Sequence, residues 1–347
     1  MWHTLKRWLG SLFANARRLA LHLSGQSLGR WVEGSYADSH HKFLHFLLPQ
    51  SLRHYYLYLP RSYSATRSSP LVVMLHGCKQ DAQTFSGGTR MNQLADEEGF
   101  LVLYPEQRRF ANAYRCWNWF DASAHRAGGE AALIAGMVGE VTRSHAVDPA
   151  RVYIAGLSAG GAMTSILASC YGHLFAACAV HSGLMYRAGE SVSEATRAMK
   201  QGSRASPETT ARQAAAQKDF LFVPAMVIHG STDSTVNPVN ADQVVEQFIA
   251  MSTFAGGGST PLTEFASSES AGERYGYEVR DYRRGDRLLS RKVLVEGLDH
   301  AWSGGSGEHA FNDPKGPDAS RMIWEFFAGF QRSEQKTIAA AMVEGGM

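Results

Sequence analysis

The chain has 347 residues, of which 44% are hydrophobic and 19% charged, and its formal net charge is +2. This composition is typical of a globular protein with a sizeable core, and the length allows one large domain or two small ones. The near-neutral charge argues against nucleic-acid binding. No apolar run reaches the roughly 18 residues that a membrane-spanning helix needs.

Residues 1–49 are predicted to form an N-terminal extension. The first 32 residues contain five Lys or Arg side chains and no acid, and their apolar residues recur at helical spacing. A basic amphipathic helix of this kind suits a lipid surface or a hydrophobic particle. A transit peptide and a helix packed on the domain are the alternatives, and the segment lacks the continuous apolar run of a secretory signal.

From about residue 50, short apolar runs alternate with helical segments. We expect strands at 54–60, 70–77, 100–106, 151–156, 176–183, 224–230, 277–284 and 291–297, and helices at 89–98, 128–145, 159–171, 239–252 and 318–333. Most interior runs are apolar on both faces, as in strands covered by helices on both sides. The sequence therefore predicts an α/β domain over 50–335, with a mostly parallel sheet of about eight strands. It also predicts an insertion near 186–219, a loop at 254–273 and a tail at 336–347.

The pattern G-x-S-x-G occurs twice, around Ser27 and around Ser158. Its meaning depends on context, because a nucleophilic serine of this type sits on a sharp turn between a strand and a helix. Ser27 follows the basic N-terminal segment and has no β-rich run before it. Ser158 lies between "RVYIA" and "AGGAMTSILAS", a strand and a helix, and is the predicted nucleophile.

A nucleophilic serine needs a histidine base and an acid that orients it, in the chain order Ser, Asp, His. Asp233 follows the strand "PAMVIHG", and His300 follows the strand "RKVLVEG". Both residues are expected on loops at the carboxyl ends of their strands. We therefore predict a catalytic triad of Ser158, Asp233 and His300.

Other residues compete for these roles. His309 is the main rival to His300, while His181 and His229 lie at strand ends and are expected to pack beside the site. Asp299 and Asp286 are the alternatives to Asp233, and Asp242 belongs to the following helix.

The tetrahedral intermediate of acyl transfer needs backbone N–H donors. The N–H of Ala159, directly after the nucleophile, is one expected donor. The second is the N–H of Cys78 in "LHGCKQD", a loop that follows an early strand and bends at Gly77.

Six ordered motifs, "LHGCKQDAQTF", "CWNWFD", "GLSAGGAMT", "VHSGL", "VIHGSTDSTVNP" and "GLDHAWSGG", resemble the catalytic domains of polyhydroxybutyrate depolymerase esterases. That family belongs to the α/β-hydrolases and is close to feruloyl and acetylxylan esterases. The resemblance covers roughly residues 50–330. It implies the α/β-hydrolase fold, the same triad, and Cys78 and Ala159 as oxyanion donors.

The resemblance also implies an aromatic substrate crevice, to which Trp117, Trp119 and Trp302 would map. Burial of Trp117 and Trp119 in the core is the alternative. Cys78 and Cys116 stand in two motifs expected near one another, which suggests a disulfide in an oxidising setting. Free thiols in a reducing compartment remain the other interpretation of the four cysteines.

The expected activity is hydrolysis of poly(3-hydroxybutyrate) or its oligomers through an acyl-enzyme, without a metal or other cofactor. A feruloyl or acetylxylan-type esterase is the alternative, and a non-catalytic granule-binding protein is a remote one. The sequence lacks the linker and substrate-binding domain of secreted depolymerases. It therefore favours a cytoplasmic location with contact to polyester granules or lipid through residues 1–32, export by a signal not recognised here being the alternative.

Overall fold

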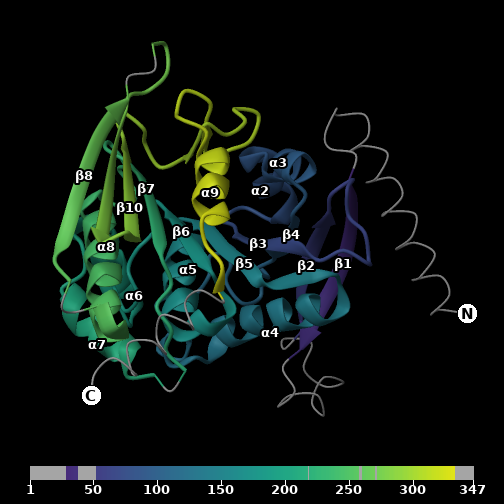
Figure 1. The fold of residues 1–347 in the computed structure, drawn as a ribbon, viewed down its shortest axis with the longest axis horizontal. Coiled ribbons are helices and arrows are strands. Elements are labelled where there is room, and N and C mark those ends of the chain that lie inside the picture. Colours follow the sequence, from purple (N-terminus) through teal and green to yellow (C-terminus); the bar gives the residue numbers. More distant parts are fainter. Residues whose placement is uncertain (1–28, 38–51, 218, 258–259, 270–271, 333–347) are drawn as a thin grey trace, which may run out of the picture.

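The structure is a computed structural model that describes residues 29–37, 52–217, 219–257, 260–269 and 272–332. Residues 1–28 of the predicted amphipathic helix and the C-terminal tail at 336–347 lie outside these residues. The end of the 1–32 segment is not helical, because Arg30 to Val32 belong to a strand. Figure 1 shows one large twisted sheet with helices packed on both faces.

Ten strands form the sheet in the order β1-β2-β4-β3-β5-β6-β7-β10-β9-β8. Their bounds are β1 Arg30–Ala37, β2 Leu52–Leu59, β3 Ser69–Leu75, β4 Leu101–Pro105, β5 Val147–Leu157, β6 Ala177–His181, β7 Ala225–Gly230, β8 Leu262–Glu269, β9 Tyr277–Arg284 and β10 Arg287–Val295. The six strands from β4 to β10 run parallel, and the pairs outside them are antiparallel. The central parallel strands are almost wholly buried, which explains why their sequences are apolar on both faces.

Two hydrophobic layers cover the sheet. On one face pack α2 Ala82–Thr89, α3 Met91–Glu98 and α9 Ala319–Ala328. On the other pack α4 Gly129–Ser144, α5 Ala159–Cys170, α6 Val192–Gln201, α7 Pro207–Ala215 and α8 Val239–Ser252. Shorter elements are the helical turns η3 Ala124–Arg126, η4 Gly172–Leu174 and η5 Thr253–Gly257, and the strand pair β11 Trp302–Ser303 with β12 Asn312–Asp313. This arrangement is the predicted α/β-hydrolase fold.

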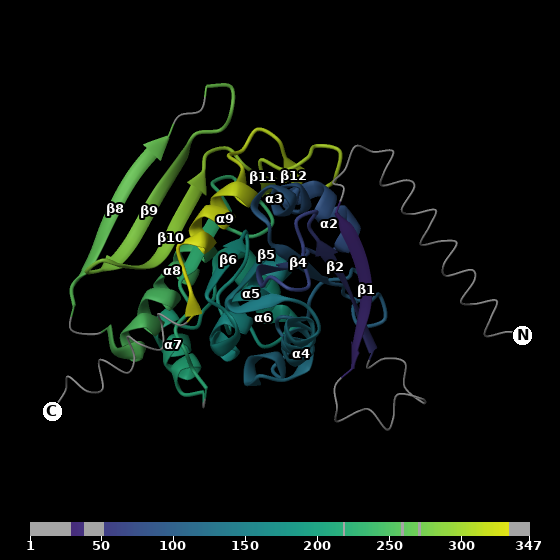
Figure 2. The same cartoon turned by 45° about the vertical axis from the view of Figure 1, so that its right-hand side comes forward.

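The sheet departs from the prediction at both edges. β1 pairs with β2 from Arg30 to Ala37, so the predicted domain boundary at residue 50 is too late. The predicted loop at 254–273 is also wrong in part, because residues 262–269 form the outer strand β8 (Figure 2). The insertion near 186–219 contains α6 and α7. It is tied to the loop after β7 by hydrogen bonds from Asn237 N to Met199 O and from Lys200 Nζ to Ser234 O, each 2.7 Å long.

Candidate active site

Ser158 occupies the turn between β5 and α5. Its backbone has φ 57° and ψ −118°, a conformation that a residue with a side chain adopts only at a cost. The turn is held on both sides: Ser158 N donates to His181 O over 2.9 Å, and Ser158 O accepts from Ala162 N over 2.9 Å. The side chain thus stands at the carboxyl edge of the parallel strands, at the N-terminus of a buried helix whose dipole favours negative charge.

Two glycines make this turn sterically feasible. A Cβ on Gly156 would lie 2.3 Å from the carbonyl oxygen of Gly160, and a Cβ on Gly160 would lie 2.1 Å from Leu75 O in β3. Real side chains do not approach backbone atoms so closely. Glycine is required at both positions because α5 packs directly against the strands.

Asp233 and His300 form a hydrogen-bonded pair. The Nδ1 of His300 lies 2.8 Å from Oδ2 of Asp233, and the Asp233 side chain is fully buried. Chain order alone predicted this pairing, and the two loops that carry the residues follow β7 and β10, which are adjacent and parallel. With Nδ1 donating to the carboxylate, Nε2 of His300 is the ring nitrogen left to accept a proton.

The rival residues lie elsewhere. The His309 ring packs over Gly87 in α2, and the Asp299 carboxylate accepts from Ser234 N over 2.8 Å. Asp286 lies in the turn between β9 and β10, where its carbonyl oxygen accepts from Arg283. His309 is therefore not paired with Asp233, whereas the ring of His300 contacts its carboxylate at 2.8 Å.

Several donors keep Asp233 ionised. Burial alone would raise the pKa of this carboxyl, but the hydrogen bonds and charges of His229 and His300 outweigh it and hold the pKa well below its usual range. Its Oδ1 accepts from the backbone N–H groups of Thr235 and Val236, over 2.9 and 2.8 Å. The Nε2 of buried His229 lies 3.4 Å from Oδ2. A carboxylate fixed in this way can hold the imidazole of His300 in one orientation and one tautomer.

His181 connects the serine turn to the histidine loop. Its carbonyl oxygen accepts from Ser158, while its Nε2 accepts from Ser303 N over 3.1 Å, and its ring stacks on Trp302. Burial, together with the smaller effects of nearby His229 and His300, lowers the pKa of His181 to about 3. The ring is therefore neutral, as its role as a hydrogen-bond acceptor requires.

The loop after β3 lies beside the serine. A Cβ on Gly77 would be 3.6 Å from the Cβ of Ser158. Among the hydrogen bonds of the described residues, none uses the N–H of Cys78 or of Ala159. Cys78 directly follows Gly77 and Ala159 directly follows Ser158, so both predicted donors adjoin residues that lie close together. Cys78 is also joined to Cys116 by a disulfide, the pairing that the motifs suggested.

A polar network braces this loop. His76 is buried, which lowers its pKa to about 4. Its Nδ1 donates to Gly77 O over 2.8 Å, and its Nε2 accepts from Gln107 N over 3.1 Å. The Glu130 carboxylate accepts from Asn118 N over 2.7 Å and from the side chains of Asn118 and Gln107, over 2.9 and 2.5 Å. Sequence reasoning missed this network. The only signal for it was the polar Asn between two tryptophans in "CWNWFD".

The predicted tryptophan crevice is wrong. Trp117, Trp119 and Trp302 are 1%, 5% and 0% exposed and belong to the core. The indole N–H of Trp117 donates to His76 O, and that of Trp302 donates to Ser320 Oγ, each over 3.1 Å. These side chains support the site from beneath rather than line it.

In the described part of the chain, no group of His, Cys, Asp and Glu side chains is arranged to hold a metal ion. Over those same residues, no helix combines the length and apolar character needed to cross a bilayer.

A family model described as Esterase PHB depolymerase matches residues 53–264, more than half of the chain. The chain belongs to this family. The match takes in the strained serine turn and Asp233, and it ends before His300. Membership in the PHB depolymerase esterase family agrees with the strand–turn–helix placement of Ser158.

The names of similar curated proteins indicate activity on different esters. Poly(3-hydroxyalkanoate) depolymerase C of Paucimonas lemoignei is 37% identical over 185 residues, which are 52% of this chain and 44% of that protein. Feruloyl esterase B of Thermothelomyces thermophilus is 32% identical over 210 residues, 56% of this chain and 68% of that protein. The chain thus spans less than half the length of the Paucimonas relative.

An acetyl xylan esterase from Aspergillus awamori has a similar solved structure, with a TM-score of 0.61, 22% identity, and coverage of 78% of this chain and 94% of that one. At this identity the likeness shows the α/β-hydrolase fold alone.

Proposed function

We propose that the protein is a serine esterase in which Ser158 is the nucleophile, His300 the base and Asp233 the orienting acid. The observation that carries the proposal is the combination of Ser158 in a strained turn with a buried Asp233–His300 pair on adjacent loops. Membership in the esterase family supports it.

The proposed reaction is a two-step acyl transfer. Ser158 Oγ attacks the ester carbonyl while His300 Nε2 takes the hydroxyl proton, and the resulting oxyanion accepts hydrogen bonds from Cys78 N and Ala159 N. The C–O bond of the ester breaks, His300 returns the proton to the leaving alcohol, and an acyl-enzyme remains. A water molecule then attacks this acyl group with the same proton transfers, releasing the acid and restoring Ser158.

We further propose a water-poor polyester, poly(3-hydroxybutyrate) or its oligomers, as substrate. Three exposed aromatic side chains support this choice: Phe110, Tyr114 and Phe311 are 92%, 66% and 36% exposed. Tyr114 O accepts from Lys79 N next to Cys78, and Phe311 O accepts from Trp302 N near His300, so the backbone of two of them is bonded to segments that carry proposed site residues. Exposed rings at a site favour contact with apolar chains. The polyalkanoate depolymerase relative supports the same choice.

A carbohydrate-linked ester is the second candidate, supported by the feruloyl and acetylxylan esterase relatives. The deciding experiment incubates wild type and Ser158→Ala with amorphous poly(3-hydroxybutyrate) and measures released 3-hydroxybutyrate and oligomers. Release by wild type alone is expected. If only feruloyl or acetyl esters are cleaved, and cleavage depends on Ser158, the triad stands and the polyester assignment fails.

The location of the protein stays a proposal. The Cys78–Cys116 disulfide supports an oxidising compartment, and so favours the alternative of export over the cytoplasm. Contact of residues 1–32 with a granule or lipid surface remains a prediction from the sequence.

A further inference from the structure

Strand β8 is an open edge of the sheet. Within the part of the chain that the structure describes, it pairs with β9 alone, and all eight of its residues are exposed. Figure 2 shows it as the outermost strand at this edge. Its sequence, LTEFASSE, contains neither proline nor lysine, which commonly protect free strand edges, and its charged residues are Glu264 and Glu269. The opposite edge, β1, is better covered, because Val32 and Tyr36 pack on the core.

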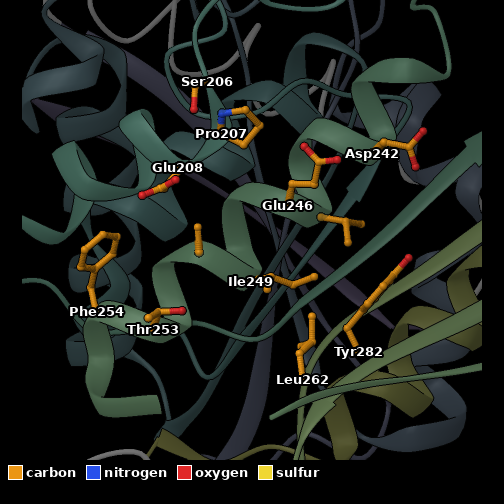
Figure 3. A pocket seen from close by; sticks show the side chains of 12 residues that line it. Ser206, Pro207, Glu208, Asp242, Glu246, Ile249, Thr253, Phe254, Leu262 and Tyr282 are labelled. Atoms are coloured by element: carbon orange, nitrogen blue, oxygen red, sulfur yellow. The ribbon is translucent and has the colours of Figure 1, made fainter. Parts of the chain in front are cut away.

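Apolar side chains gather at this edge. Phe254, Leu262 and Phe265 are 42%, 43% and 60% exposed. A groove of about 640 Å³ runs between α8 and the outer strands, with Ile249 and Phe254 on its helix side and Leu262 and Tyr282 on its sheet side (Figure 3). Unpaired backbone groups beside exposed apolar side chains are the features of a strand-pairing surface.

We infer that β8 pairs antiparallel with β8 of a second copy of this chain, joining two sheets across a two-fold axis. A free strand edge offers alternating N–H and C=O groups, which another strand satisfies most completely. An identical copy supplies that strand in a symmetric, self-complementary contact. The inference does not depend on the proposed esterase activity, because β8 lies three strands away from β7, which leads to Asp233.

The charges of β8 allow this pairing. In an antiparallel pair, residues directly opposite each other point to the same face of the sheet. A two-fold axis perpendicular to the sheet therefore lies midway between the two copies of one residue. If that residue is Phe265, the two Phe265 rings meet and Glu264 faces Ala266. If it is Ala266, Phe265 faces Ser267 and Glu264 faces Ser268.

Two carboxylates that face each other would oppose pairing, and neither register brings them together. Glu264 is also paired within its own chain, to Arg280 over 3.0 Å.

The first experiment measures mass in solution by sedimentation velocity over a wide range of protein concentrations. Wild type is expected to form a dimer. Phe265→Lys, which places two ammonium groups at the centre of the contact, is expected to weaken the dimer at least tenfold. Val192→Lys also replaces an exposed apolar residue but lies outside β8 and the groove, and it should leave the dimer intact. A wild type that stays monomeric, or a dimer that Phe265→Lys leaves unchanged, would overturn the inference.

A second experiment tests the register by cross-linking. The four native cysteines leave no exposed thiol, because Cys78 and Cys116 are bridged and Cys170 and Cys178 are buried. Under mild oxidation, either Phe265→Cys or Ala266→Cys should give a covalent dimer. Thr263→Cys should not, since its two copies would lie at least about 13 Å apart along the strands. Cross-linking at Thr263 alone, or at none of the three, would contradict the pairing.

Discussion

Replacing Cys116 by Ser opens the disulfide that holds the loop of Cys78, and it should lower stability substantially. The bridge closes a loop with a sequence separation of 38 residues. The chain-entropy relation gives about 4 kcal/mol of stabilisation for a loop of this length. The free energy of unfolding should therefore fall by about 2–4 kcal/mol, the lower value applying if the opened chain retains residual structure.

Activity should suffer less than stability. The loop keeps the hydrogen bonds from Trp117 Nε1 to His76 O and from Lys79 N to Tyr114 O after the bridge is removed. Loss of an oxyanion donor costs roughly 100-fold or more in kcat, so a loosened donor should cost less, about tenfold.

The assay is urea unfolding followed by fluorescence, on wild type and on Cys116→Ser, with and without reductant. Reductant should lower the stability of wild type to that of the variant and leave the variant unchanged. If the variant loses less than about 1 kcal/mol, or if reductant destabilises it as much as wild type, the reasoning about the bridge is refuted.

Three further predictions test the surroundings of the site. Gly160→Ala should prevent folding or cost several kcal/mol of stability, since its Cβ would lie 2.1 Å from a backbone oxygen of β3. Gly139→Ala, in the middle of α4, should instead stabilise the protein by about 0.5–1 kcal/mol. Thermal unfolding compares the two variants, and equal stabilities would contradict the packing described for Gly160. Burial lowers the pKa of His181 to about 3, so the unfolded chain binds a proton that the folded protein does not below about pH 6.5. Stability should therefore decline as the pH falls below that value, and His181→Gln should reduce the slope near pH 5 by about 1.4 kcal/mol per pH unit in urea titrations; an unchanged slope would show that the ring is not buried and neutral. Glu130→Ala should lower kcat about tenfold with little change in KM, because the carboxylate that braces the oxyanion loop is removed. Glu140→Ala on the same helix, whose carboxylate accepts from a tyrosine hydroxyl, should leave kcat unchanged. Equal effects of the two variants in steady-state kinetics would argue for a general loss of stability.

The sequence predicted the centre of the fold better than its edges. Strands buried on both faces are continuous apolar runs, and these correspond to β3, β4, β6, β7 and the second half of β5. β8 escaped prediction because an edge strand exposed on both faces is defined by its backbone hydrogen bonds and needs no apolar pattern. β1 was missed for a related reason, since its residues are only partly buried and mix polar with apolar types.

The site, too, was predicted from the sequence only in part. The order of Ser158, Asp233 and His300 along the chain was informative because parallel strands bring their carboxyl ends to one edge of the sheet. The direction of an aromatic side chain is not visible in a motif, and so Trp117 and Trp302 were misplaced. Glu130 accepts hydrogen bonds from Asn118 and Gln107, which precede it by 12 and 23 positions in the chain. No local sequence pattern indicates contacts over such separations.

The central claim is that Ser158, and no other serine, carries the acyl group. The most direct measurement treats the protein with a fluorophosphonate and identifies the modified peptide by mass spectrometry, with Ser158→Ala as the control. We expect one adduct per chain, on Ser158, and none on the variant. An adduct on another residue, such as Ser27 in the second G-x-S-x-G pattern, or undiminished ester hydrolysis by Ser158→Ala, would contradict it.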